Sequence, residues 1–220
     1  MLATYDLEKQ PTTFDFVTWL SIAMGNGATE VSFINRDKIQ VKKYPKDVAE
    51  KRFKDILLPV CEIAGVPVVE GIGKSFPYFW SDCPRKPWKF KYQKKYDHRT
   101  VTIRDSFRNP HRNSNREAWE CFAKDIGAVV IDDCDLKPIP LKERWDLYQC
   151  RMNLFVDNGP ANLCYFSDAP YISMKFQPTP HLEKIGFPKG AQIPWANKNQ
   201  KLVWEDDTYE NLTNLFGSLG

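Results

Sequence analysis

Four arginines lie at four-residue intervals where an apolar strand pattern gives way to a helix start. The stretch is VTIRDSFRNPHRNSNREAW, residues 101–119, and the arginines are Arg104, Arg108, Arg112 and Arg116. A guanidinium offers paired N–H donors that match two phosphate oxygens, and a helix N-terminus just beyond adds free backbone N–H groups. An arginine at a strand end, followed by an arginine-rich loop, therefore predicts an anion site that a diphosphate would fit.

The same arginines also have a simpler interpretation. Arg108 and Arg112 could face solvent, as charged loop residues usually do. Arg116, inside the expected helix, could pair with Glu120 one turn later. The sequence alone leaves both interpretations open.

A second candidate is VDNGPAN, residues 156–162, which turns an expected strand into a helix. Gly159 allows a close backbone approach to a ligand, and Pro160 suits the first helical turn. The amide groups of Asn158 and Asn162 can serve hydroxyl groups or a base. The pattern is neither the dinucleotide fingerprint nor a P-loop, and a plain turn has the same composition.

Residues 85–116 carry eleven Lys or Arg residues against two acids. Four aromatic residues are interleaved with these cations: Trp88, Phe90, Tyr92 and Tyr96. A cationic groove with stacking rings can bind nucleic acid, so one alternative function is a non-catalytic nucleic-acid or polyanion-binding protein. A solvated basic ribbon or linker has the same charge pattern.

The acidic stretch IDDCD ends another expected strand with Asp132, Asp133 and Asp135. Such carboxylates can bind Mg²⁺ or a ribose, so a second alternative is a Mg-dependent nucleotide-binding protein or phosphohydrolase. They are also ordinary strand-to-loop residues. The six cysteines include no CxxC pair and there are only three histidines, so we expect no zinc or His-rich metal centre.

The composition predicts a soluble globular protein. A chain of 220 residues, 42% of them hydrophobic, can bury an ordinary core, and the net charge of +3 alone indicates no particular partner. No window reaches the roughly 18 uninterrupted apolar residues of a membrane helix. The N-terminus, MLATYDLEKQPTT, lacks a secretory-signal pattern, so we expect a cytoplasmic protein.

Strand and helix patterns alternate on both sides of a Pro-rich, aromatic and basic linker that begins near residue 74. Before the linker we predict a helix at 14–25, a strand at 30–34, a helix at 47–65 with a bend at Pro59, and a buried strand at 66–71. After it we predict strands at 100–106, 128–132, 152–157, 170–176 and 201–206, with helices at 113–127, 140–150, 161–167 and 208–219. Asn113 or Ser114 would cap the helix at 113–127. The pattern predicts an α/β protein of two small Rossmann-like halves with mostly parallel sheets, residues 1–95 and 96–220.

The second half resembles a known family. RDSFRNPHRNSNREAW, then AVVID, then PLKERWDLYQCRMNLFVDNGPANLCYFSDAPYISMKF, then LVWEDDTYENLTNLF, follow each other as in the nucleotide-sugar-binding half of GT-B class glycosyltransferases. The likeness is to heptosyltransferase-like and uncharacterised bacterial or phage proteins of this class. It spans residues 100–216, and its motifs are short.

The resemblance implies a hexosyltransferase or related enzyme that moves a sugar from a nucleoside-diphosphate donor to an unknown acceptor, with no bound metal or cofactor. Arg104 would contact the donor diphosphate, helped by Arg108 and Arg112, and residues 158–160 would shape the helix start that faces the donor. The N-terminal half would be the acceptor side. Asp15 is the candidate base there, although it also fits a first-turn helix acid. Both halves are smaller than the usual domains of this class.

Overall fold

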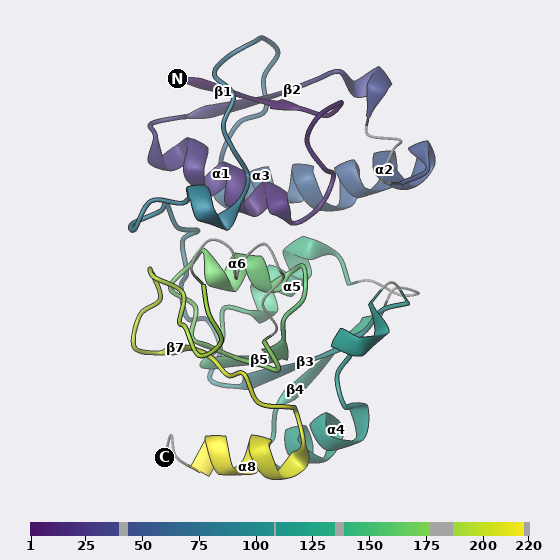
Figure 1. Cartoon of the computed structure of the whole chain (residues 1–220), viewed down its shortest axis with the longest axis vertical. Helices are drawn as coiled ribbons and strands as arrows, with labels where there is room; N and C mark the ends of the chain where they lie inside the picture. The colour runs from purple at the N-terminus through teal and green to yellow at the C-terminus, as the bar shows by residue number, and fades with distance from the viewer. Residues whose placement is uncertain (40–43, 108, 135–138, 177–186, 218–220) are drawn as a thin grey trace. The chain divides into compact units, whose positions relative to one another are not determined.

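The computed structural model describes residues 1–39, 44–107, 109–134, 139–176 and 187–217. The chain divides into two compact units (Figure 1). The first unit holds Met1–Lys91 and Pro140–Lys142, and the second holds Tyr92–Ile139 and Glu143–Gly220. The predicted boundary at residue 95 lies four residues beyond this division, and the return of 140–142 to the first unit was not predicted. No helix within the described ranges is long and apolar enough to cross a membrane.

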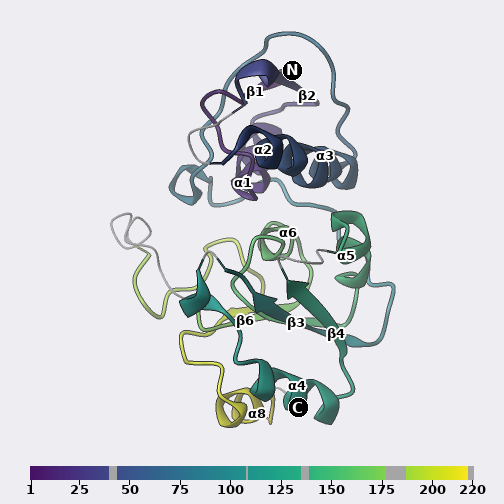
Figure 2. The ribbon, with the colours of Figure 1, turned by 90° about the vertical axis from the view of Figure 1, so that its right-hand side faces the viewer.

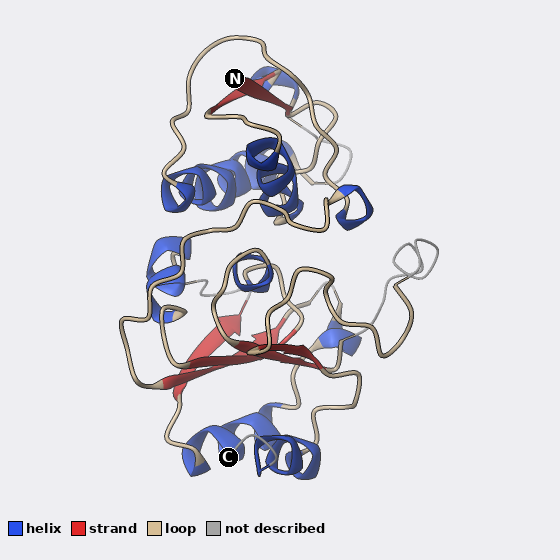
Figure 3. Ribbon diagram, turned by 90° about the vertical axis from the view of Figure 1, so that its left-hand side faces the viewer, coloured by secondary structure: helices blue, strands red, loops and turns tan. Residues whose placement is uncertain are grey.

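The first unit is built around two parallel strands. Its elements are β1 (Leu2–Asp6), α1 (Asp15–Gly25), β2 (Glu30–Ile34), α2 (Lys46–Arg52) and α3 (Leu58–Ala64). β1 and β2 pair in parallel, and isolated bridges join Ala3 to Lys74 and Val31 to Val68, one on each side of the pair. The three helices lie on one side of these strands (Figure 3).

The first unit departs from the Rossmann-like half that the sequence predicts. The sequence pattern did not predict β1, because a strand of only five residues gives a weak alternation. The buried strand predicted at 66–71 is wrong: this segment contributes only the bridge at Val68, whose side chain is 45% exposed. The two-stranded sheet does not confirm a second Rossmann-like half.

The predicted helix at 47–65 forms, with a change of type in the middle. A π-helical segment, Phe53–Leu57, separates α2 from α3. Pro59 follows it by two residues, and a proline removes one backbone donor and crowds the carbonyl four residues earlier. A wider turn at that carbonyl relieves the crowding, so the irregularity predicted at Pro59 occurs just before it.

The second unit is a layered α/β structure with one parallel sheet. Its strands are β3 (Arg99–Asp105), β4 (Val129–Cys134), β5 (Met152–Val156), β6 (Tyr171–Met174) and β7 (Gln200–Leu202). Its helices are α4 (Arg116–Asp125), α5 (Leu141–Leu147), α6 (Ala161–Tyr165) and α8 (Tyr209–Gly217). α4 and α8 cover one face of the sheet, and α5 and α6 cover the other (Figures 1 and 2). The Rossmann-like sheet predicted for this half is confirmed.

The strand order indicates at which strand ends a ligand would bind. The order is β4-β3-β5-β6-β7, with every neighbouring pair parallel. The chain leaves β3 toward one edge of the sheet, returns to the other side of β3 as β5, and then continues outward. This is the 2-1-3-4-5 order of a doubly wound sheet, and such sheets bind ligands beyond the carboxyl ends of the strands where the order reverses. Here those are the ends of β3 and β5.

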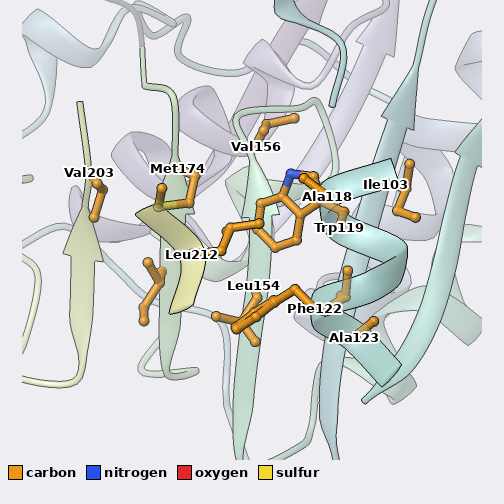
Figure 4. Close-up of a cluster of buried hydrophobic side chains, with 12 residues drawn as sticks. Ile103, Ala118, Trp119, Phe122, Ala123, Leu154, Val156, Met174, Val203 and Leu212 are labelled. Atoms are coloured by element: carbon orange, nitrogen blue, oxygen red, sulfur yellow. The ribbon is translucent and has the colours of Figure 1, made fainter. Parts of the chain in front are cut away.

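The face covered by α4 and α8 carries a cluster of buried apolar side chains (Figure 4). Val101 and Ile103 of β3, together with Leu154 of β5, pack against the rings of Trp119 and Phe122 from α4. The alternation of β3 and β5 and the helical spacing of α4 produce this core, as the sequence predicts. The helix stop after α4 is also confirmed, where Gly127 takes a φ of +61°.

The N-cap of α4 differs from the prediction. Asn115 caps the helix by accepting from the N–H of Ala118 at 3.4 Å. Asn113 and Ser114, the predicted caps, instead fix the loop before the helix: Asn113 Oδ1 accepts from the N–H of Ser106 at 2.9 Å. Polar loop residues that compete for one cap cannot be ranked from spacing alone.

Candidate anion-binding site

Arg104 lies at the end of β3, where its backbone is fixed from both sides. Its N–H donates to Ser114 Oγ at 2.9 Å, and its carbonyl accepts from the N–H of Ser114 at 3.0 Å. The guanidinium Nη1 donates to the carbonyl oxygen of Asp157 at 3.1 Å. Arg104 is 8% exposed, which is unusual for an arginine. The loop that follows β3 therefore holds this cation at the carboxyl edge of the sheet.

Arg112 reaches the same place from the loop after β3. It ends a short 3₁₀ turn, Pro110–Arg112. Its Nη2 donates to the carbonyl oxygen of Asp157 at 3.3 Å and forms an ion pair with the Asp157 carboxylate. Arg104 and Arg112 thus meet at the residue that directly follows β5. Arg108, the third arginine predicted to contact the donor diphosphate, lies outside the described residues.

Asp157 is the residue that joins these arginines. Its Oδ1 accepts from the hydroxyl of Tyr165 at 3.0 Å, and that hydroxyl lies 2.9 Å from Ser173 Oγ on β6. Burial, with a smaller contribution from the Asp157 charge, raises the pKa of Tyr165 well above its ordinary value, so the phenol stays protonated. Asp157 was not among the predicted site residues, although it stands inside the VDNGPAN stretch.

The turn after β5 uses its amide groups internally. Asn158 donates from Nδ2 to the carbonyl of Val156 at 3.0 Å and accepts from the N–H of Ala161 at 2.9 Å. Asn162 donates to the carbonyl of Gly159 at 3.0 Å. Pro160, with φ of −60°, stands directly before α6, as the pattern predicts. These contacts build the turn at the edge of the sheet, and a direct contact of these amides with a ligand stays a prediction.

Asp15 belongs to the first unit. It is the first residue of α1, is exposed, and accepts from the hydroxyl of Thr13 at 2.6 Å. An acid in the first turn of a helix is stabilised by the helix dipole. The predicted first-turn acid is confirmed, and the role of Asp15 as a base stays a prediction.

Arg116 lies apart from the other arginines in its contacts. Its guanidinium pairs with Asp132 at 2.9 Å, Glu120 at 3.3 Å and Asp105 at 3.8 Å. The pairing with Glu120 predicted as the simpler interpretation is confirmed. Three carboxylates around one guanidinium give Arg116 no excess charge for a ligand.

The acidic stretch at the end of β4 is divided between two arginines. Asp132 pairs with Arg116, and Asp133 Oδ1 lies 2.8 Å from Nη1 of Arg144. Asp135 lies outside the described residues. Within the described ranges, no group of three or more His, Cys, Asp or Glu side chains is arranged to hold a metal ion.

Arg144 is a buried arginine that the sequence reasoning missed. It is 1% exposed, and its Nε and Nη1 have no acceptor in hydrogen-bond geometry among the described residues, although Asp133 is at ion-pair distance. Burial acts to lower the pKa of Arg144, but Tyr148 and Asp133 outweigh it and raise the pKa. Asp133 is the register partner of Arg104. The spacing of Leu141, Arg144 and Tyr148 puts the arginine on the buried stripe of α5, and this was a usable signal.

The basic and aromatic segment uses its rings for packing. Phe90 is 2% exposed and lies edge-on to Trp88. The hydroxyl of Tyr92 donates to the carbonyl of Cys150 at 2.7 Å, and that of Tyr96 donates to Asp146 at 2.6 Å. Tyr96 is 36% exposed and its ring stacks on His98, so the nucleic-acid alternative stays a prediction.

The carboxyl edge of the five-stranded sheet therefore carries two converging arginines, one aspartate between them, and a turn built from the predicted residues. The arrangement offers several guanidinium N–H donors at a strand switch point. No protein-family model, curated protein or solved structure matches this chain.

Proposed function

We propose that this chain binds a nucleoside-diphosphate sugar at the carboxyl edge of its five-stranded sheet and transfers the sugar to an acceptor without a bound metal. The observation that carries the proposal is the convergence of Arg104 and Arg112 on Asp157 at the ends of β3 and β5. Two cations that lie close together are expensive to maintain unless an anion compensates them. Asp157 places one carboxylate at this point through its ion pair with Arg112, and a diphosphate would bring further negative charge to the same two guanidinium groups.

The charge at this edge suits a departing diphosphate. Sugar transfer releases a nucleoside diphosphate, and negative charge grows on the phosphate oxygen that had been bonded to the sugar. Fixed cations stabilise that charge without reorganising. The guanidinium of Arg104 is buried and donates to the Asp157 carbonyl, so it is already oriented before a ligand arrives. Arg112 adds a second, partly exposed fork. The contacts thus support diphosphate binding more directly than they support the transfer step.

The binding part of the proposal is tested by calorimetry and thermal shift with nucleoside diphosphates and their sugars, with EDTA present throughout. Arg104→Ala and Arg112→Ala should each weaken binding about 10- to 100-fold, because each removes a charge-assisted hydrogen bond of roughly 1.5–3 kcal/mol. Arg116→Ala is the matched control and should leave affinity within about twofold, because Arg116 is paired with other carboxylates. If no nucleotide binds the wild-type chain, the proposal is wrong.

The transfer part is tested by slow hydrolysis of a bound donor, with water as the acceptor. Asp15→Asn should lower the rate of nucleoside-diphosphate release at least tenfold while nucleotide affinity stays the same, if Asp15 acts as the base. Asp47→Asn, which changes the corresponding first-turn acid of α2, is the control. Equal rates in the two variants would remove Asp15 from the mechanism and leave the binding site untouched.

A further inference from the structure

Lys175, directly after β6, has an unusual backbone. Its φ is +50°, and among the described residues the only other non-glycine with a positive φ is Asn35. Asparagine tolerates this left-handed region, whereas for lysine it is unfavourable. The conformation is fixed by the N–H of Lys175, which donates to the carbonyl of Glu205 at 3.0 Å. Strain of this kind is found where the position of a side chain matters.

The strained backbone directs the lysine side chain toward the arginine loop. Nζ donates to the carbonyl of Asn113, the residue after Arg112, at 3.2 Å. β5 lies between β3 and β6 in the sheet, so this side chain reaches past the end of β5 to the loop that follows β3. The ammonium group therefore joins the edge where Arg104 and Arg112 meet.

The anchoring contacts leave part of the ammonium group uncommitted. Besides Asn113, its partner is Asp207, whose Oδ1 lies 3.4 Å from Nζ. An ammonium group has three N–H donors, and the described part of the chain supplies these two acceptors. The Lys175 side chain is 20% exposed, so the remaining donor can reach a ligand.

Asp207 is held by two neutral donors as well as by Lys175. Its Oδ2 already accepts from the N–H of Asn115 at 2.7 Å and from Nε1 of Trp119 at 2.8 Å. Both of these donors are neutral and contact one oxygen, so the Lys175 ammonium group compensates the buried charge from the side of Oδ1. An ion pair does not by itself require a left-handed backbone, so the positive φ of Lys175 is a separate observation.

We propose that Lys175 is a third anion-binding residue of this site and contacts the second phosphoryl group of a diphosphate, so that the site selects diphosphates over monophosphates. The inference rests on the proposed function, because it assigns a specificity to the same site. Arg104 and Arg112 would hold one phosphoryl group, and Lys175, on the other side of the β5 end, would hold the next. A point charge on a flexible stem suits this second contact.

The test is calorimetry with inorganic pyrophosphate and inorganic phosphate as probes, at low salt and with EDTA. The wild-type chain should bind pyrophosphate at least tenfold more tightly than phosphate. Lys175→Met should remove most of this preference and change phosphate affinity less than threefold. Lys201→Met, which removes an exposed lysine of β7, should keep the preference.

A purely structural lysine would give a different result. If Lys175 only anchors the loop that carries Arg112, Lys175→Met should weaken both probes by the same factor, and the assignment is overturned. Lys175→Gly provides a second check, because glycine adopts the left-handed backbone without strain: this variant should lose the preference to the same extent as Lys175→Met. A wild-type chain that binds neither probe would overturn the site as a whole, whereas an unchanged preference in both variants would overturn only the role of Lys175.

Discussion

The two faces of the five-stranded sheet are built from different chemistry. The face toward α4 and α8, called the apolar face, is packed mainly with apolar side chains (Figure 4), and its buried carboxylate, Asp207, accepts from Trp119 Nε1 near the carboxyl edge. The opposite face, which we call the polar face, buries residues with hydroxyl, amide, phenol and guanidinium groups, each residue being at most 8% exposed. Its residues are Thr100, Thr102, Arg104, Arg144, Tyr148, Asn153, Tyr165, Tyr171 and Ser173. One face of the sheet therefore depends mainly on close packing, whereas the other also needs many hydrogen-bond partners.

The partners on the polar face form links across neighbouring strands. Thr100 on β3 donates to Asn153 on β5 at 2.8 Å. Closer to the carboxyl edge, the Tyr165 hydroxyl connects Ser173 on β6 to Asp157. Buried polar groups are unfavourable unless they are paired, and paired ones fix the geometry around them. The polar face therefore ends in the residue that holds both arginines, and it supports the candidate site in a way the apolar face does not.

The largest expected effect comes from the apolar face. Phe122→Ala should lower the free energy of unfolding by about 3–5 kcal/mol, because it opens a cavity under a ring that is 1% exposed. Denaturation with urea measures this loss. If the two faces are as separate as the structure indicates, pyrophosphate affinity should stay within about twofold of the wild-type value under conditions where the variant is folded.

Val130→Ala is the control for this change. Val130 lies on the edge strand β4 with 47% of its surface exposed, so its truncation should change stability by less than about 0.5 kcal/mol. A tenfold loss of pyrophosphate affinity in folded Phe122→Ala would show that the two faces are not independent, because packing on the apolar face would then also set the geometry of the arginines.

The next largest expected effect is a loss of folding stability at alkaline pH that arises on the polar face. Burial raises the pKa of Cys150, Cys164, Tyr148, Tyr165 and Tyr171 on the polar side of the sheet. A group with a raised folded-state pKa stabilises the fold fully below its unfolded pKa, and the contribution is lost as pH rises through the folded value. The loss should begin above about pH 8.5 for the thiols and above about pH 10 for the phenols.

Unfolding by urea at pH 7.5 and pH 9.5 tests this sign. Each buried thiol should contribute a loss of about 1.4 kcal/mol per pH unit above its unfolded pKa, so Cys164→Ala should reduce the loss between these pH values by roughly that amount. Cys121→Ala, which removes an exposed free thiol, should leave the loss unchanged. An identical pH response in Cys164→Ala and the wild type would show that this side of the sheet is not closed to water.

Local patterns predicted most of the second unit. β3 follows from the alternation in TVTIRDS, and α8 from the helical spacing in TYENLTNLF. The order of the strands does not follow from such patterns, because local patterns do not show on which side of β3 the strand β5 pairs. Local patterns also fail in short segments: β1 was not predicted, and a strand was predicted at 66–71 where only a bridge forms. In such segments burial, and not alternation, decides whether a strand forms.

The sequence predicted the arginines of the site but not the residues around them. Arg104 and Arg112 could be recognised by their residue type at a strand end, and the structure brings both to one point. Asp157 is 45 residues from Arg112 in the sequence, so no spacing rule links them. Arg144 and Lys175 were missed for different physical reasons. The first is visible only as a charged residue on an apolar helical stripe, and the second depends on a backbone conformation that residue type does not reveal.

The smallest expected effect concerns Asp157, where the polar face meets the candidate site. Asp157→Asn keeps the size and the acceptor oxygen for Tyr165 but removes the negative charge that occupies Arg112. Pyrophosphate should bind about fivefold more tightly, since removing a repulsive, partly exposed charge and freeing a guanidinium are together worth about 1 kcal/mol. Asp132→Asn is the matched control, because it neutralises a carboxylate held by Arg116, and it should have no effect on binding. Weaker binding in Asp157→Asn would mean that the carboxylate positions the arginines for the ligand and does not compete with it. In that case the hydrogen-bonded polar face, through Tyr165 and Asp157, would set the affinity of the site directly.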